Sequence, residues 1–190
     1  LSAMMQEMRT KGGDAPRSPQ KQNPVLPTAI DIATIRERAN AGDAQAQNLL
    51  ARMYVVGKNV PKDYVQAQQW FEKAAAQGNA VAQVELGWLY ENGRGVPKDY
   101  VQAAKWYKKA AAQGNAAAQL QLGILYLVGR GVPQDYVRAY MWWSYLIAAN
   151  STADEQELAA ILRHNVAPSM TPAQIAEAQR LSQQCQAQQF

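Results

Sequence analysis

The chain has 190 residues, with 19 Lys and Arg against 15 Asp and Glu, a formal net charge of +4 and a single cysteine. That cysteine, Cys185, cannot form an internal disulfide or a multi-cysteine metal site, and the modest charge of mixed sign does not favour nucleic acid as a partner. No segment has the ~20 consecutive apolar residues of a membrane-spanning helix, so no membrane insertion is expected.

Residues 1–27 are rich in proline, glycine and polar side chains. Such a composition buries too little apolar surface to order itself, so we predict a flexible N-terminal tail. Its methionines suit docking into an irregular groove. The small residues of Leu1-Ser2-Ala3 are similar to the end of a cleaved secretory signal and favour an exported location.

A 36-residue unit follows three times, at 42–77, 78–113 and 114–149. Each copy opens with Gly, Asp or Asn, and Ala-x-Ala-Gln. A tyrosine, a second glycine, a Val-Pro pair, an Asp-Tyr-Val triplet and a tryptophan then follow at constant offsets. A fixed period between about 20 and 50 residues indicates a solenoid of stacked repeats. Residues 28–190 are therefore predicted to form one elongated domain.

Two helices per copy are predicted from the residues that begin and end them. In the first copy, a helix runs from Asp43 to Val55 and ends before Gly57, which supplies the left-handed conformation of a helix end. A second helix starts at Asp63, where Gln66 predicts a reciprocal capping box. The same signals place the other helices at 79–91, 115–127, 99–113 and from 135 onward, with a second capping box at Gln102.

The residues that recur in every copy are predicted to form the core between stacked helices. Small alanines allow close approach of helices, and large side chains fill the space between them. In the first copy the alanines are Ala46, Ala67 and Ala74, and the large residues are Leu50, Tyr54 and Trp70. We predict that Trp70, Trp106 and Trp142 are core, and that Trp143 is either partly exposed or covered by the final helices.

Extending the period predicts both ends of the array. Residues 28–41 align with the second helix of a repeat and should form an N-terminal half-repeat, with Ile30, Ile32 and Ile35 as its apolar contacts. Residues 150–190 align with a degenerate fourth repeat. Thr171-Pro172-Ala173-Gln174 predicts the start of a closing helix. The apolar side of that helix carries Ile175, Ala178, Leu181 and Cys185.

The repeat pattern is clearest at Gly78–Gln83, Leu86–Tyr90, Gly93–Asp99 and Ala103–Trp106, and it resembles the Sel-one-like repeat, a relative of the tetratricopeptide repeat. The resemblance covers residues 39–149. It implies an all-α, right-handed superhelical α/α solenoid and a non-enzymatic scaffold that assembles other proteins, often in the bacterial envelope or in signalling.

Two further details concern the match to this family. Residues 170–179 are similar to the closing helix of bacterial members, which adds to the preference for the bacterial periplasm or envelope. The first copy departs from the pattern at Ala51 and at Lys58-Asn59, where the other copies have glycine and Arg-Gly. We expect its loop to differ slightly.

Residues with catalytic chemistry are few. His164 is the single histidine and is expected at the surface, and Cys185 is expected to be a small core residue with His164 as its only candidate base. Ser18-Pro-Gln-Lys21 matches the Ser-x-x-Lys motif of penicillin-recognising enzymes, but it lies in the tail without companion motifs. An enzyme of envelope or β-lactam chemistry is therefore kept as an alternative, and no metal or cofactor is expected.

The positions that vary between copies predict a binding groove. On the first helices, positions 45, 48, 49, 52 and 55 and their counterparts share one helical face. First helices line the concave side of tetratricopeptide-like stacks, so this face is predicted to hold a peptide or helix of a partner protein. The candidate residues are Arg52, Val84, Trp88, Glu91, Leu120, Ile124 and Leu127.

Trp88 is the predicted anchor of this groove, because the other copies have Arg52 and Ile124 at its position. Two alternatives stay open. The aliphatic residues and Trp88 itself would pack on the neighbouring helix pair, or the chain would self-associate with its N-terminal tail lying in a groove.

Overall fold

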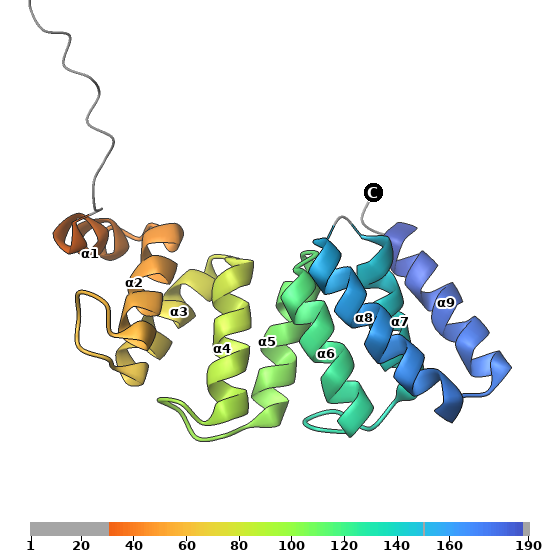
Figure 1. Cartoon of the computed structure of the whole chain (residues 1–190). Coiled ribbons are helices and arrows are strands. Elements are labelled where there is room, and N and C mark those ends of the chain that lie inside the picture. The colour runs from red at the N-terminus through yellow and green to blue at the C-terminus, as the bar shows by residue number, and fades with distance from the viewer. Residues whose placement is uncertain (1–30, 150, 188–190) are drawn as a thin grey trace, which may run out of the picture. The chain divides into compact units, whose positions relative to one another are not determined.

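The computed structural model describes residues 31–149 and 151–187, which belong to the unit Asp31–Phe190; the other unit is Leu1–Ile30. The predicted tail and Ile30 lie outside the described residues. The described part is helical throughout (Figure 1). Its elements are α1 (Ile32–Asn40), α2 (Ala44–Val56), α3 (Tyr64–Ala76), α4 (Ala80–Asn92), α5 (Tyr100–Ala112), α6 (Ala116–Val128), α7 (Tyr136–Ala148), α8 (Ala153–Val166), the short 3-10 helix η2 (Ala167–Ser169) and α9 (Pro172–Ala187).

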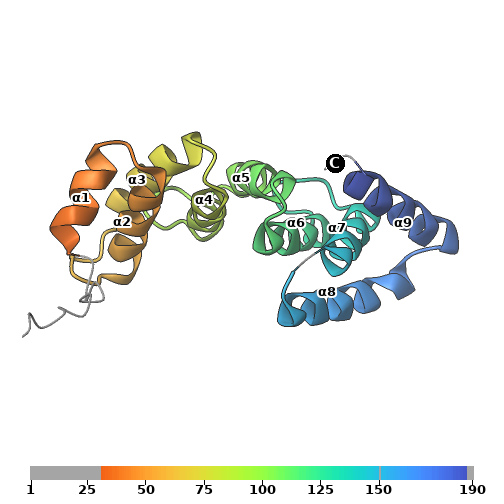
Figure 2. The ribbon, with the colours of Figure 1, turned by 90° about the horizontal axis from the view of Figure 1, so that it is seen from above.

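Successive helices pack on one another from α1 to α8, so the unit is an α/α solenoid as predicted. The pairs α2 with α3, α4 with α5 and α6 with α7 form the three repeats. In Figure 2 the first helices of these pairs follow one side of the array and the second helices follow the other. The first helices therefore present a continuous face built from one helix of each repeat.

The helix ends confirm the predicted caps and correct the predicted capping boxes. Asp63 accepts from the backbone amide of Gln66 at 3.0 Å. The amide of Asp63 itself donates to the carbonyl of Tyr54 at 3.0 Å instead of donating to the Gln66 side chain. The second copy repeats this, with Asp99 donating to Tyr90 at 2.9 Å. The backbone of the preceding helix thus replaces the glutamine that the sequence pattern predicted.

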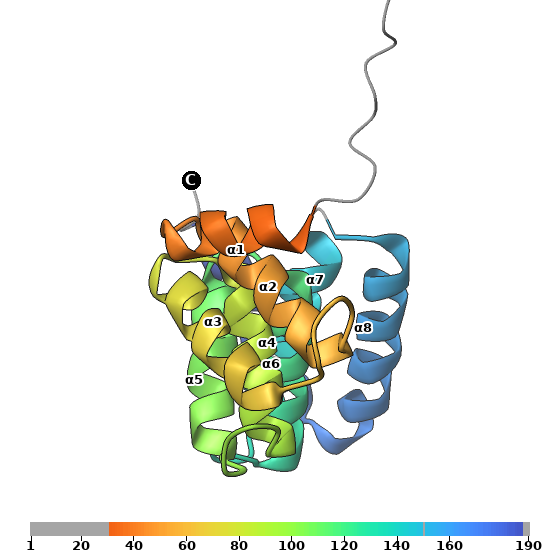
Figure 3. The ribbon, with the colours of Figure 1, turned by 90° about the vertical axis from the view of Figure 1, so that its left-hand side faces the viewer.

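The first described helix, α1, begins at Ile32 after Asp31, whose side chain accepts from the amide of Ala33. Aspartate is among the strongest N-cap residues. The predicted start at Thr28 lies outside the described residues. Ile35 is buried as predicted. In the end-on view α1 runs across the direction of the helices that follow it (Figure 3).

The core aromatic residue of each repeat is the one after the recurring tryptophan. Phe71, Tyr107 and Trp143 are all 0 % exposed, whereas Trp70, Trp106 and Trp142 are only half-buried. Lysine ammonium groups cover two of the half-buried rings, with Lys73 Nζ 4.0 Å from the centroid of Trp70 and Lys109 Nζ 4.3 Å from that of Trp106. The prediction that the recurring tryptophans form the core is therefore wrong by one residue, because strict recurrence does not distinguish the inner face of a helix from its edge.

The buried aromatic rings explain two glycines inside helices. A Cβ on Gly87 of α4 would lie 2.5 Å from the Tyr107 ring, and one on Gly123 of α6 would overlap the ring of Trp143. The indole Nε1 of Trp143 donates to the carbonyl of Leu120 at 3.4 Å. Helix α6 therefore lies directly on Trp143. The side chain is buried and not partly exposed, and these contacts come from α6, whereas the sequence-based prediction named only the final helices as a cover.

The first copy departs from this arrangement in a correlated way. It has Ala51 where the other copies have glycine, and its buried ring is the smaller Phe71, in the same core cluster. Its loop has Asn59 at φ 63°, close to the 73° of Gly95 in the second copy. At this position the backbone conformation is thus close to that of the second copy, because asparagine is among the side chains that tolerate positive φ.

A buried glutamine at the end of each opening motif links the repeats. The Gln83 side chain donates to the carbonyl of Ala75 at 3.2 Å and accepts from the Gln113 side chain at 2.8 Å. The first copy reproduces the pair, with Gln77 donating to Gln47 at 2.8 Å. In the third copy Gln119 still donates to Ala111, but its Oε1 is buried without a partner. The sequence accounts for this, since Ala149 stands where Gln77 and Gln113 stand in the earlier copies.

Because Gln83 has a glutamine partner and the Gln119 Oε1 has none, the same Gln→Leu substitution should lower the free energy of unfolding by different amounts at the two positions. Gln83→Leu should lower the free energy of unfolding by about 1–3 kcal/mol, because it removes two hydrogen bonds, one to the carbonyl of Ala75 and one from the Gln113 side chain. Gln119→Leu should cost less, because it also removes the unpaired Oε1. Urea unfolding of both variants measures the difference, and equal losses would contradict the role assigned to Gln113.

The C-terminal helices keep the register of a fourth repeat but not its pairing. Helix α9 packs on α7, as α8 does, instead of pairing with α8. Figure 2 shows the two helices diverging from their connection. The predicted cap is confirmed, since the amide of Thr171 donates to the Gln174 side chain at 2.8 Å and the amide of Gln174 donates to Thr171 at 3.2 Å. Ala178 is fully buried, with Ile175, Leu181 and Cys185 packed against the same core cluster.

Candidate functional site

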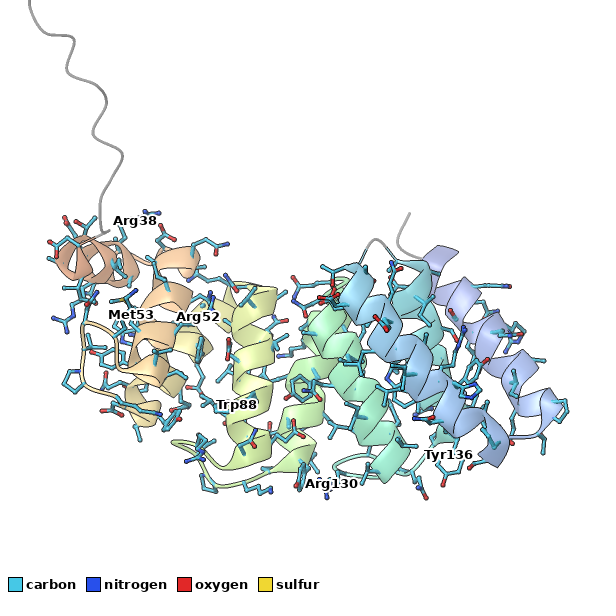
Figure 4. The ribbon with its side chains drawn as sticks, in the orientation of Figure 1. Arg38, Arg52, Met53, Trp88, Arg130 and Tyr136 are labelled. Atoms are coloured by element: carbon cyan, nitrogen blue, oxygen red, sulfur yellow. The ribbon has the colours of Figure 1, made fainter. Side chains whose placement is uncertain are left out.

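Among the candidate groove residues, Arg52 is the one that lies on α2. Its side chain is 59 % exposed, and its Nε lies 3.9 Å from Glu85 Oε1 on α4. Burial raises the pKa of Glu85, and the positive charge of Arg52 opposes that rise. Figure 4 shows Arg52 at the junction of α2 and α4. This ion pair links α2 of the first repeat to α4 of the second.

The sequence left open whether Trp88 is exposed in the groove or packed on the neighbouring helix pair, and part of the ring is in each environment. Its ring is half-buried and packs against the core cluster of the first two repeats. It also forms a tilted contact with Tyr64, with the ring centroids 6.3 Å apart. The remaining part of the indole is accessible, and Glu85 lies one helical turn before it on α4. Trp88 thus contributes both to repeat stacking and to the surface next to Arg52.

Glu91 has a structural partner that the sequence did not indicate. The phenol of Tyr107 donates to Glu91 Oε2 at 2.8 Å. Burial is the main cause of a strongly raised pKa of Tyr107, and the negative charge of Glu91 adds to it. Tyr107 therefore stays protonated and keeps donating, so the carboxylate of Glu91 has this bond to the α5 core residue.

The remaining candidates of the predicted groove are half-buried aliphatic side chains. They pack against the core cluster of the later repeats, so they contribute to the stacking of neighbouring helix pairs. Their role in binding stays a prediction. These residues are Val84, Leu120, Ile124 and Leu127.

A hollow of about 270 Å³ lies on α2 and the loop after it. Leu49 is 37 % exposed and Val56 is 70 % exposed. Arg52 and Lys58 supply two cations among the lining side chains, and Met53 completes the apolar lining. Figure 4 shows Met53 and Arg52 on the same helix. Of these residues the sequence prediction named Arg52 among its groove candidates and included position 49 in the variable face. For the other lining residues, the sequence offered one indication, the apolar side chain of Val56 directly before Gly57.

The residues considered for catalysis are not assembled into a site by the described structure. His164 is exposed on α8, and Cys185 is partly buried on α9 against the core. Within residues 31–149 and 151–187, no group of three or more His, Cys, Asp or Glu side chains is arranged to hold a metal ion. The Ser18–Lys21 motif lies outside the described residues. No described helix has the length and apolar character needed to span a bilayer.

Comparison with known proteins decides the family. The Sel1 repeat model matches residues 44–79, 80–115 and 116–151, which together make up more than half of the chain. The chain belongs to the Sel1 repeat family. The matched units coincide with the three repeats predicted from the sequence, each displaced by two residues.

Solved structures of Sel1 repeat proteins agree with this assignment. A Sel1 repeat protein from Oxalobacter formigenes is 35 % identical, covers 69 % of this chain and 98 % of its own, and superimposes with a TM-score of 0.61. The protein c5321, a protective antigen of uropathogenic Escherichia coli with this fold, is 33 % identical over 81 % of this chain and 40 % of its own, with a TM-score of 0.59.

A third structure supports the fold alone. A Sel1 repeat protein from Klebsiella pneumoniae is 24 % identical over 81 % of this chain and 74 % of its own, with a TM-score of 0.54. No curated protein matches the sequence. Sel1 repeat proteins are generally non-enzymatic scaffolds for protein interactions. Membership therefore assigns this Sel1 repeat chain to an interaction class and leaves its partner to be inferred from its surface.

Proposed function

We propose that this Sel1 repeat chain is a scaffold that binds a peptide segment of a partner protein on the face formed by α2 and α4. The observation that supports this proposal is the hollow on α2, where exposed Leu49 and Val56 lie beside the cations Arg52 and Lys58. An apolar depression with a few polar groups at its edge is the usual form of a peptide anchor site.

The hollow selects the chemistry of the segment. An aliphatic or aromatic side chain of the partner fills the space over Leu49 and Met53, and a nearby carboxylate pairs with Arg52 or Lys58. Trp88 extends the surface onto α4, where the accessible part of its ring packs against the next residues of the segment. Isolated exposed apolar residues are common on proteins, but a cluster at a depression marks an interaction site.

A peptide library displayed on phage and selected on the immobilised chain tests this proposal. Selected peptides should combine an apolar anchor with an acidic residue. Leu49→Asp should weaken their binding by about 30-fold, the effect of losing an interface residue worth ~2 kcal/mol. Fluorescence anisotropy with a labelled selected peptide measures the change. The substitution should leave thermal stability nearly unchanged, because Leu49 is already 37 % exposed.

A matched control separates this site from a general loss of apolar surface. Leu158 on α8 is 44 % exposed, and Leu158→Asp introduces the same charge away from the hollow. It should leave peptide affinity within about twofold. If Leu49→Asp and Leu158→Asp have the same effect, or if neither has any, the peptides bind elsewhere and the proposed site is rejected.

A further inference from the structure

A second surface lies at the end of the repeats where the two helices of each pair are connected. The connecting loops are 57–63, 93–99 and 129–135; the last two lie at the bottom of Figure 1, and the first lies at its left. Figure 4 shows Arg130 and Tyr136 at this end of the repeats. Lys58 of the first loop lines the hollow on α2. The side chains assigned below to the second surface do not line it, so the inference does not rest on the proposed peptide site.

At this end of the repeats each of two tyrosines is flanked by two cations. Lys62 Nζ lies 5.0 Å from the ring centroid of Tyr64, and Arg94 Cζ lies 5.7 Å from it. The next repeat reproduces this group, with Lys98 Nζ at 4.9 Å and Arg130 Cζ at 5.3 Å from the ring of Tyr100. We call the residues Lys62, Tyr64, Arg94, Lys98, Tyr100 and Arg130 the cationic edge.

Glycines fix the arginines of the cationic edge in place. A Cβ on Gly95 would overlap the backbone carbonyl of Tyr64, and one on Gly131 would overlap that of Tyr100. Both glycines have positive φ, 73° and 69°. The loop of one repeat therefore rests directly on the start of the second helix of the previous repeat, and it carries its arginine over the tyrosine there.

The four cations of the edge are not neutralised by the protein. All four are exposed, and the ion pairs of the described residues involve other basic side chains, namely Arg38, Arg52, Arg138 and Arg180. The neighbouring carboxylates, Asp63 and Asp99, accept from backbone amides at the starts of α3 and α5. The positive charge of the edge is therefore directed toward solvent and available to a partner.

Exposed valines add apolar surface to each of these groups. Val65 is 49 % exposed and Val101 is 50 % exposed, each directly after its tyrosine. Each junction between repeats thus presents a lysine, a tyrosine and a valine from one repeat together with an arginine from the next, and the following junction presents the same set. A partner matches this pattern when it alternates acidic and aliphatic side chains along an extended or helical segment.

We propose that the cationic edge binds an acidic polypeptide segment with interspersed aliphatic residues. The chain's own N-terminal segment does not fit this chemistry, because residues 1–30 contain four Lys and Arg against two Asp and Glu. An anionic membrane surface fits less well than a peptide. Asp63 and Asp99 lie within the edge and would face lipid phosphates, whereas a peptide places its carboxylates beside the cations and avoids these two residues.

The test compares two variants with the same change of charge. The edge variant carries Lys62→Gln, Arg94→Gln, Lys98→Gln and Arg130→Gln. The control variant carries Lys73→Gln, Lys105→Gln, Lys108→Gln and Lys109→Gln. In the control variant Lys73 and Lys109 also lie over aromatic rings, but in the last turns of α3 and α5, away from the connecting loops.

The probe is a fluorescent peptide of Glu-Glu-Val repeats, measured by anisotropy against the full chain. The edge variant should bind it about tenfold more weakly than the wild type, and the control variant within about twofold. Added salt should weaken wild-type binding, because exposed charges are screened. Equal weakening in both variants would reduce the effect to overall charge and overturn the proposal, as would failure of the wild type to bind.

A second variant distinguishes a loss of binding caused by the changed charge from one caused by unfolding. Lys62→Glu with Lys98→Glu leaves both arginines on their tyrosines and reverses only the charge of the two lysines. It should show the same loss of peptide binding with an unchanged circular dichroism spectrum. If the peptide still binds this variant as well as the wild type, the proposal fails.

Two further measurements distinguish other occupants of the edge. Cosedimentation with phosphatidylserine vesicles that is lost in the edge variant, without binding of the Glu-Glu-Val peptide, would assign the edge to membranes and overturn the proposal. Sedimentation velocity that shows a dimer of the wild type, lost in the edge variant, would assign it to a second copy of the chain and also overturn the proposal. Failure of the edge experiment leaves the Leu49 experiment unaffected, because the two variants change different residues.

Discussion

Trp143→Ala is expected to lower the free energy of unfolding by about 3–5 kcal/mol, the usual cost of truncating a fully buried large aromatic side chain. Trp143 is 0 % exposed, and its ring lies over Gly123 in the core of the later repeats. Alanine would leave a cavity between α6 and α7 and remove the bond from the indole to the carbonyl of Leu120. Urea unfolding followed by circular dichroism measures the loss.

Trp142→Ala is the matched control, since it removes the same side chain one position earlier. Trp142 is half-buried and makes an edge contact with Tyr145, with centroids 6.2 Å apart. It should cost about 1–2 kcal/mol, because part of the ring is already in water. A larger loss for Trp142→Ala than for Trp143→Ala would restore the interpretation that the recurring tryptophan is the core residue.

Gly87→Ala is expected to destabilise the protein by about 1–3 kcal/mol, although alanine is the better helix former by ~1 kcal/mol. The reason is steric, since the new Cβ would lie 2.5 Å from the ring of Tyr107 and the neighbouring helix would have to move. The sign of the effect is informative, because an unhindered glycine in a helix gains stability from this substitution. Thermal and urea unfolding give the sign directly.

Shortening the opposing side chain should reverse this sign. In a Tyr107→Leu background, Gly87→Ala should be neutral or stabilising by up to ~1 kcal/mol, because the ring that blocks the Cβ is gone. Each variant is compared with its own parent, so the stability lost with the Tyr107–Glu91 hydrogen bond cancels. If Gly87→Ala stabilises the protein with Tyr107 intact, then α4 and α5 are not as close as the ring contact indicates.

The repeat period was enough to predict most of the fold. The helix starts at Asp43 and Asp63 follow from local chemistry, because a capping side chain and the backbone amides it accepts from are close in sequence. The helix C-termini were predicted in the same way, because glycine readily adopts the positive φ of the residue that follows a helix. Stacking follows from the repetition itself, since one repeat cannot bury both of its faces.

Sequence reasoning failed where two residues compete for the same role. The position of Trp70 holds tryptophan in all three copies, whereas the position of Phe71 holds a different aromatic residue in each copy, yet Phe71 is the buried residue. In a helix, neighbouring positions differ by a large rotation about the axis, and only the packed partner decides which of them points inward. The capping boxes failed for a related reason, because the amide of Asp63 is taken by the carbonyl of Tyr54 in another helix.

The candidate site was only partly predictable. The variable positions of the first helices include Leu49 and Arg52, which line the hollow on α2. They left open whether the aliphatic residues pack on the neighbouring helix pair, and they did not reveal that Glu91 accepts from the phenol of Tyr107 or that the hollow lies at Leu49 and Val56. Those properties depend on which neighbouring helix covers each residue.

The sequence by itself determined the family, the helices and their caps, because these depend on residues within one 36-residue unit and on its repetition. Only the tertiary structure decided which aromatic ring is buried, why Gly87 and Gly123 are required, and where surface remains uncovered. Burial and exposure are set by contacts between helices that are distant in sequence. The cationic edge depends on such a contact, since Arg94 reaches Tyr64 only when one repeat is stacked on the next.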